Sequence, residues 1–204
     1  MSVESYGERE TNRLEAFSDG VFAFAITLLV LGLHDPVSNG SSSLFQGLLS
    51  EWPTFFAFMT SFIAELIMWM NHHNMFNYIR RIDREFMLLN GMLLFFITLT
   101  PFTTSLVADH ILDSNAVTAA VAYSGGFLLL ALVWNGVWRY ASSEHRLLGK
   151  HVSPGQVKGI TRKYYVAPVF YSVAVVAAFF SPLASLATIF LVAAFYGITA
   201  TMSN

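Results

Sequence analysis

One long apolar run limits what this chain can fold into. It opens at Arg13, and from residue 17 to residue 33 it holds a single charged side chain, Asp19. A helix of about 20 apolar residues matches the roughly 30 Å hydrocarbon core of a bilayer. A carboxylate within such a span costs up to ~3 kcal/mol on insertion scales, so Asp19 needs a partner, a hydrated cavity or a proton. We therefore predict a transmembrane helix over residues 14–34 that carries one polar face.

The rest of the chain has the same character. Hydrophobic residues make up 55% of the 204 residues, charged residues only 12%, and the mean hydropathy is +0.56, whereas a soluble domain carries about 25% charged residues. Cysteine is absent, which excludes disulfides and thiolate chemistry. We predict an all-α integral membrane protein with a single domain over residues 1–204 and six transmembrane helices. The predicted spans are 14–34, 44–72, 86–107, 116–140, 164–180 and 183–202.

The positive charges predict how these spans are oriented. All 11 Lys and Arg residues lie before the first span, between the second and third, or between the fourth and fifth, counting their edges. Loops rich in Lys and Arg stay in the cytoplasm, so both termini are predicted to be cytoplasmic and the protein to reside in the plasma (inner) membrane. The first run lacks a cleavage site after it and is predicted to be retained. Pro36 is predicted to end the first helix, and residues 37–43 to form a loop.

The first predicted helix has two different faces. With Phe24 as the reference at 100° per residue, an apolar stripe lies within about 60° of it. The stripe consists of Phe17, Gly20, Phe24, Thr27, Leu28 and Leu31. Ser18 and Asp19 point away from the stripe. Periodicity alone leaves open whether the stripe contacts lipid, another helix or a pore, and the polar pair also suits ordinary packing between helices.

Polar residues of the next two helices are expected at the depth of Asp19. His72 ends the second span on the cytoplasmic side, and Asn90 lies a few residues into the third from that same side. Trp69, one turn from His72, has an indole N–H to donate. We expect a hydrogen-bonded cluster that joins the first three helices, with Arg13 as countercharge to a carboxylate. Its polar members are Arg13, Ser18, Asp19, Trp69, His72 and Asn90.

Two roles are open for this cluster. It can be scaffolding that positions a pore, or Asp19 and His72 can titrate and carry or gate protons. A metal site is not predicted, because Glu65 lies seven residues before His72, about 10 Å along a helix, and His73 adds no third ligand. Glu65 itself receives no role.

Other function classes find little support in the sequence. It contains no HExxH motif, no nucleotide-binding fingerprint and no nucleophile–base pair, so we predict that the protein is not an enzyme and needs no cofactor. The basic loops are short and explained by topology, so nucleic acid is not an expected partner. An inverted repeat with paired broken helices, typical of secondary transporters, is also missing.

Two motifs resemble the TMEM175 family of potassium channels. The first is Arg13-x-x-x-Phe17-Ser18-Asp19, directly before a long apolar helix. The second matches the family's second and third helices in spacing and residue type. It consists of Trp69-x-x-His72-x-x-x-Phe76, followed by Asp83, Asn90, Pro101 and Phe102. Because the first motif occurs once, the chain resembles the single-repeat prokaryotic form with six helices.

The resemblance implies a pore lined by the first helix. In the family, four subunits surround a central axis, and bulky apolar side chains of the first helices form the constriction. On this sequence these positions are Phe24, Leu28 and Leu31. Thr27 matches a position that adds a hydroxyl layer. Phe24 replaces the usual isoleucine or leucine, which implies either a narrower ring or a side chain that rotates aside when the pore opens. The motif that includes Phe17 is implied to hold the pore helix against the second and third helices.

The expected function is a potassium-permeable leak channel with modest selectivity for K⁺ over Na⁺. One first helix cannot enclose a pore, so the expected partners are further copies of the chain, as a homotetramer, together with membrane lipid and the permeant potassium ions. The alternative is a proton-conducting or proton-coupled transporter that uses Asp19 and His72.

Overall fold

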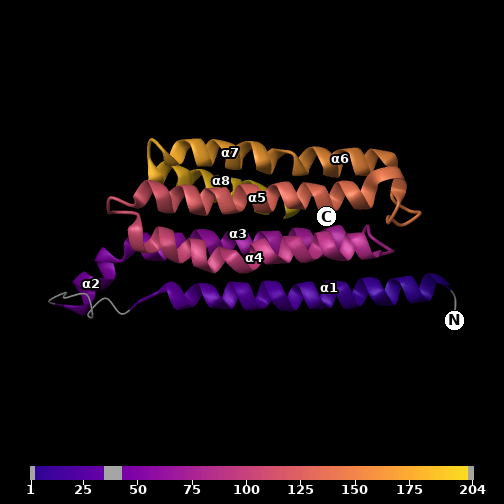
Figure 1. Ribbon diagram of the computed structural model, residues 1–204, viewed down its shortest axis with the longest axis horizontal. Coiled ribbons are helices and arrows are strands. Elements are labelled where there is room, and N and C mark those ends of the chain that lie inside the picture. The colour runs from indigo at the N-terminus through magenta and orange to yellow at the C-terminus, as the bar shows by residue number, and fades with distance from the viewer. Residues whose placement is uncertain (1–2, 35–42, 202–204) are drawn as a thin grey trace.

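The structure, a computed structural model, describes residues 3–34 and 43–201, and these fold into long helices that run side by side (Figure 1). The helices are α1 (Val3–Leu28), η1 (Leu29–Gly32), α2 (Leu44–Ser50), α3 (Trp52–Phe76), α4 (Arg84–His110), α5 (Ala116–Ser142), η3 (Ser143–His145), α6 (Pro154–Tyr164), α7 (Val166–Ala178) and α8 (Pro182–Thr201). The predicted all-α class is confirmed. Pro36 and residues 37–42, predicted as a helix end and a loop, lie outside the described residues.

Within residues 3–34 and 43–201, four helical segments are long and apolar enough to cross a membrane. They are Glu10–Gly32, Trp52–Phe76, Arg84–His110 and Ala116–His145, and they correspond to the first four predicted spans. Pro182–Ile198 forms a shorter apolar helix. The predicted span 164–180 contains α7, which is 13 residues long.

The predicted second span, 44–72, is wrong at both ends. Residues 44–50 form a separate helix, α2, and α3 begins only at Trp52 and continues to Phe76. Ser43 caps α2 by accepting a hydrogen bond from the backbone N–H of Gln46. Pro53 lies in the first turn of α3, where a missing N–H costs nothing. Two helices therefore begin within a segment that hydropathy presents as one apolar run.

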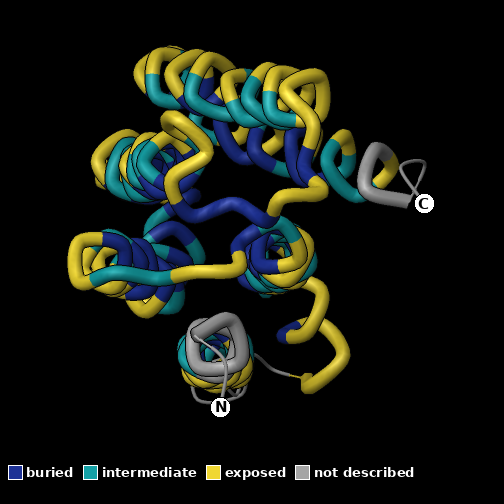
Figure 2. Tube along the Cα trace, turned by 90° about the vertical axis from the view of Figure 1, so that its right-hand side faces the viewer, coloured by how far each residue is buried: buried dark blue, intermediate teal, exposed yellow. Residues whose placement is uncertain are grey.

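α1 lies along one side of the bundle, where it packs on α3 and α4. α5 packs on α4, α7 and α8, and α3 also contacts α8. In Figure 2 the exposed residues of α1 face away from the other helices. α1 is thus supported from one side only.

Two loops meet at one end of the bundle. The α3–α4 loop and the α5–α6 region form an isolated antiparallel bridge between Ile79 and Leu148. The Arg80 N–H donates to the Leu147 carbonyl over 3.0 Å, and the Gly149 N–H donates to the Tyr78 carbonyl over 2.9 Å. The two basic loops that sequence analysis assigns to the same side of the membrane are therefore joined.

A break separates α6 from α7, and side chains of other helices satisfy it. Pro168 has no N–H to donate to the Tyr164 carbonyl, and Asn135 Nδ2 of α5 donates to that carbonyl instead, over 2.9 Å. The Tyr196 hydroxyl of α8 donates to the Lys163 carbonyl over 2.6 Å and accepts from the Ala167 N–H over 3.0 Å. Because hydrocarbon offers no hydrogen-bond partners, the backbone groups released at a helix break within a membrane must find partners in the protein.

This arrangement predicts the effect of Asn135→Leu. The Tyr164 carbonyl would lose its partner, which costs about 1–3 kcal/mol for a buried group and lowers the melting temperature of a chain this size by roughly 2–4 °C per kcal/mol. Thermal unfolding of the purified protein in detergent measures the shift. Asn12→Leu, at an exposed position of α1, is the control, and equal melting temperatures for the two variants would contradict the role of Asn135.

Candidate functional site

A directed chain of hydrogen bonds links α3, α4 and α1. His72 Nε2 lies 3.0 Å from Asn90 Oδ1, and Asn90 Nδ2 donates to Ser18 Oγ over 2.9 Å. The Ser18 hydroxyl donates onward to the Leu14 carbonyl over 2.8 Å. Because the Asn90 amide oxygen only accepts, His72 Nε2 is the donor. Ser18, His72 and Asn90 are completely buried, so the chain is shielded from competition with water.

Aromatic rings surround the histidine of this chain. The His72 ring centroid lies 4.6 Å from that of Phe76, 5.4 Å from that of Phe22 and 6.2 Å from that of Trp134. These rings pack His72 on several sides and fix its orientation towards Asn90.

Two further contacts join α1 directly to α3. Trp69 Nε1 donates to Asp19 Oδ1 over 2.9 Å, and His73 Nδ1 lies 2.8 Å from Glu15 Oε1. The two helices run antiparallel, so each pair repeats one turn from the other. The cluster predicted from the sequence does not include Glu15. Its signal is the four-residue spacing that Glu15 and Asp19 share with Trp69 and His73.

Two predicted cluster members lie elsewhere. Arg13 Nη1 pairs with Glu10 Oε1 of the same helix over 3.3 Å, at an exposed position, and Phe17 is 64% exposed. The expectation that Arg13 is the countercharge within the cluster is wrong, because six residues along a helix turn Arg13 about 120° away from Asp19. The Trp69 indole N–H takes its place as the partner of the Asp19 carboxylate.

The apolar stripe of α1 points away from the rest of the chain. Phe24 is 63% exposed and Leu31 is 70% exposed, while Phe22 and Ala25 on the opposite face are completely buried. The Thr27 hydroxyl donates to the Phe24 carbonyl over 2.8 Å, which leaves its lone pairs available on the exposed face. Leu31 lies in the η1 turn, and Leu28 directly precedes this turn. Residues three apart are eclipsed in a 3₁₀ turn, so Leu31 lies on the same side of the helix as Leu28.

A second polar group lies deeper along α3. Ser61 Oγ lies 2.7 Å from both Thr104 Oγ1 and the Tyr123 hydroxyl, which joins α3 to α4 and α5. Glu65, one turn further, is completely buried, and neither carboxyl oxygen has a hydrogen-bond partner in the described part of the chain. Within residues 10–34 and 43–198, no three His, Cys, Asp or Glu side chains are grouped as a metal site would require.

Comparison with known proteins assigns the chain to a family. Residues 13–101 match the family model of the endosomal/lysosomal potassium channel TMEM175. A potassium channel of Chamaesiphon minutus is 41% identical over 198 residues, which cover 96% of this chain and 98% of the relative. The chain belongs to the TMEM175 family. The resemblance seen in its two sequence motifs is thereby confirmed.

Other members of the TMEM175 family give the same assignment. A potassium channel of Streptomyces collinus is 34% identical over 92% of each chain. The crystal structure of a lysosomal potassium-selective channel TMEM175 homolog from Chamaesiphon minutus superimposes with a TM-score of 0.85 at 39% identity, covering 94% of this chain and 98% of that one. The chain is accordingly a multi-pass membrane protein of a channel family and not an enzyme.

The contact between Trp69 and Asp19 predicts a measurable coupling. Trp69→Phe keeps the ring but removes the N–H, and Asp19→Leu removes the carboxylate. Each variant should lower the free energy of unfolding. The loss in the double variant should be smaller than the sum of the two single losses, by about 0.5–3 kcal/mol. Trp52→Phe, at a half-exposed tryptophan of the same helix, is the control. Strict additivity of the two changes would show that the bond contributes nothing.

Proposed function

We propose that this chain forms a potassium-permeable leak channel of the plasma (inner) membrane, with modest selectivity for K⁺ over Na⁺. The observation that carries the proposal is the exposed apolar stripe on α1, whose far side is fixed to α3 and α4. The names of the bacterial relatives, which are potassium channels, support it.

The pore in this proposal is shared between copies. A helix supported on one side leaves its other face for a partner, and one such helix cannot surround an ion path. Closed rotational symmetry places identical faces around one axis, and we propose four copies, each contributing one α1. The remaining helices then form the outer layer of a single six-span domain over residues 1–204, in which the fifth crossing, over residues 164–180, contains α7 and the sixth, over residues 183–202, contains α8.

The constriction is proposed at three apolar rings. Phe24 and Leu31 are exposed, and the half-buried Leu28 lies between them on the same side of the helix. Rings of such side chains restrict ions by excluding water. Potassium holds its hydration shell less tightly than sodium, so squeezing that shell favours potassium. The outward lone pairs of Thr27 supply one layer of oxygen between these rings.

The hydrogen-bonded cluster acts as scaffolding in this proposal. Ser18 and Asp19 bond to α4 and α3, respectively, and so set the rotation of α1 about its own axis. With α1 in this rotation, the apolar stripe faces the proposed pore. Both termini and the basic loops lie on the cytoplasmic side.

The constriction is tested by Leu28→Ala in liposomes that contain purified protein and a potassium gradient, with sodium in a parallel set. Removing three carbons from each Leu28 side chain widens the ring that these side chains form, so we expect the variant to alter the potassium rate or lose discrimination against sodium. Leu132→Ala, at an exposed leucine of α5, should behave like the natural protein. Absence of flux above empty liposomes, from folded and oligomeric protein, would contradict the channel.

A second candidate function is proton conduction through Asp19 and His72. It is favoured by the position of both groups in the cluster, and by the human relative named as a proton channel, which is 37% identical over 48% of this chain and 21% of its own length.

Asp19→Asn separates the two functions. The amide oxygen of asparagine still accepts from the Trp69 indole, so scaffolding is preserved, and we expect potassium flux and its pH dependence to stay unchanged. Glu15→Gln, which alters the neighbouring carboxylate, is the control. Loss of proton flux in Asp19→Asn alone would favour the proton path.

A further inference from the structure

Glu65 is an acidic side chain enclosed within the helix bundle. It is completely buried, and within residues 10–34 and 43–198 it forms no ion pair with a Lys, Arg or His side chain. Ser61 and Thr104 are bonded across the antiparallel pair α3 and α4. One turn further along each helix, Thr100 of α4 therefore lies opposite Glu65.

The neighbouring hydroxyl groups direct their protons away from Glu65. The Thr104 hydroxyl donates to the Thr100 carbonyl over 2.7 Å. In its contact with Ser61 it must therefore accept, so the Ser61 hydroxyl is the donor there. Because the single Ser61 proton is then used, the Tyr123 hydroxyl donates to Ser61. These three hydroxyls form a directed chain that has no proton left to donate to Glu65.

The Thr100 hydroxyl completes this pattern. It donates to the Phe96 carbonyl over 3.4 Å, so it offers Glu65 only its lone pairs. An ionised carboxylate can only accept hydrogen bonds, whereas a carboxylic acid has an O–H to donate. A buried carboxylate with neither donors nor a countercharge takes up a proton instead of remaining charged. The surroundings of Glu65 therefore suit the neutral acid.

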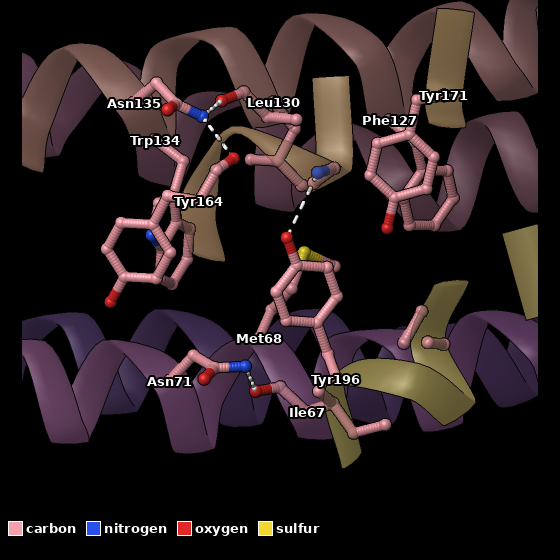
Figure 3. Close-up of a pocket in the computed structure, with 14 residues that line it drawn as sticks. Ile67, Met68, Asn71, Phe127, Leu130, Trp134, Asn135, Tyr164, Tyr171 and Tyr196 are labelled. Carbon is pink, nitrogen blue, oxygen red and sulfur yellow. Dashed lines mark hydrogen bonds between the residues drawn. The ribbon is translucent and has the colours of Figure 1, made fainter. Parts of the chain in front are cut away.

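The same surroundings favour a proton over a metal cation. A cation held by one carboxylate needs room for itself and for several further oxygen ligands. The cavity between α3, α5, α7 and α8 lies on another face of α3, where Ala64, Ile67 and Met68 line it (Figure 3). Glu65 is not among its lining residues. A proton needs no space of its own.

We propose that Glu65 is a proton-binding site in the core of the chain, where it is a neutral acid at neutral pH and donates its O–H to the Thr100 hydroxyl. The bound proton joins α3 to α4, and α1 packs on both of these helices. Proton binding at Glu65 thus stabilises the pair of helices that supports α1. The site is separate from the cluster of Asp19 and His72.

Few other titratable side chains lie near this part of α3. α5 contributes Tyr123, α8 contributes Tyr196 and α1 contributes Asp19, each hydrogen-bonded to another residue. On α3 itself, His72 lies two turns further along. The charged residues of α4 lie in its first and last turns, and η1, α2 and α8 contain no charged residue or histidine.

Infrared spectroscopy of the reconstituted protein at neutral pH tests the protonation. We expect the carbonyl band of a protonated carboxylic acid, which an ionised carboxylate lacks. Glu65→Gln should remove this band, and Glu85→Gln, at an exposed position of α4, should leave it. An unchanged band in Glu65→Gln would overturn the proposal, because Glu65 would then be ionised in the natural protein.

A second pair of variants tests the acceptor and keeps the proposal testable if Glu65→Gln does not fold. Thr100→Val removes the hydroxyl to which the acid donates, so the acid band should move to higher frequency. Thr98→Val is the matched control, because its exposed hydroxyl also donates to a backbone carbonyl of α4. An acid band that stays in place in Thr100→Val would overturn the assigned hydrogen bond.

Stability measured against pH tests the site by another readout. Free glutamate ionises at pH ~4.3, so above that pH the natural protein must take up a proton to fold, whereas Glu65→Gln need not. The ratio of folded to unfolded natural protein should therefore fall, relative to the variant, by up to about tenfold per pH unit above about pH 5. Denaturant unfolding in detergent, followed by tryptophan fluorescence, measures this ratio.

Two results of the unfolding experiment would overturn the proposal. One is a difference between the natural protein and Glu65→Gln that does not change with pH. The other is stabilisation of the natural protein, but not of Glu65→Gln, by sodium or potassium chloride relative to choline chloride, because a metal cation would then occupy the site.

Discussion

One amide side chain, that of Asn90, joins the three helices on which the proposed pore depends. Its oxygen accepts from His72 of α3 and its nitrogen donates to Ser18 of α1, and all three residues are fully buried. Apolar packing in lipid gives little preference for one rotation of a helix, because lipid tails are as apolar as the side chains that they replace. Hydrogen bonds are directional, so they determine which face of α1 contacts the bundle. A rotation by half a turn would take Ser18 and Asp19 away from their partners on α4 and α3 and would turn the stripe towards these helices.

The same demand of the apolar solvent explains the irregular parts of the bundle. Where Pro168 interrupts the helix ladder, Asn135 and Tyr196 satisfy the carbonyls and the N–H that are released. These partners come from α5 and α8, so the break between α6 and α7 links both helices to α5 and α8. The break borders a cavity between α3, α5, α7 and α8. Helix interruption and its side-chain compensation thus occur at one place, at the edge of this cavity.

Sequence patterns predicted much of α1 and of the cluster. The helical period of 100° per residue predicts that Phe24 and Ser18 lie on different faces, and in the structure Phe24 is exposed and Ser18 is buried. His72 and Asn90 were expected at the same depth, and they form a hydrogen bond. Patterns failed where the answer depends on tertiary neighbours. Hydropathy shows that residues 44–72 are apolar but not that the helix restarts at Trp52. A buried carboxylate needs a partner, and both a guanidinium and an indole N–H can supply one. Arg13, expected as a countercharge within the cluster, pairs outside it with Glu10, whereas the expected donor Trp69 binds Asp19.

Different forces hold the middle of α1 and its C-terminal end. Ser18 and Asp19 secure the middle of the helix through hydrogen bonds, and Glu15 adds a contact with His73. Towards the C-terminal end, the buried face consists of apolar residues such as Ala25 and Leu29, and the helix tightens into the η1 turn. Apolar contacts tolerate small displacements that a directional bond does not. The positions proposed for the constriction therefore lie where α1 can adjust its side chains and backbone without breaking the cluster that orients it.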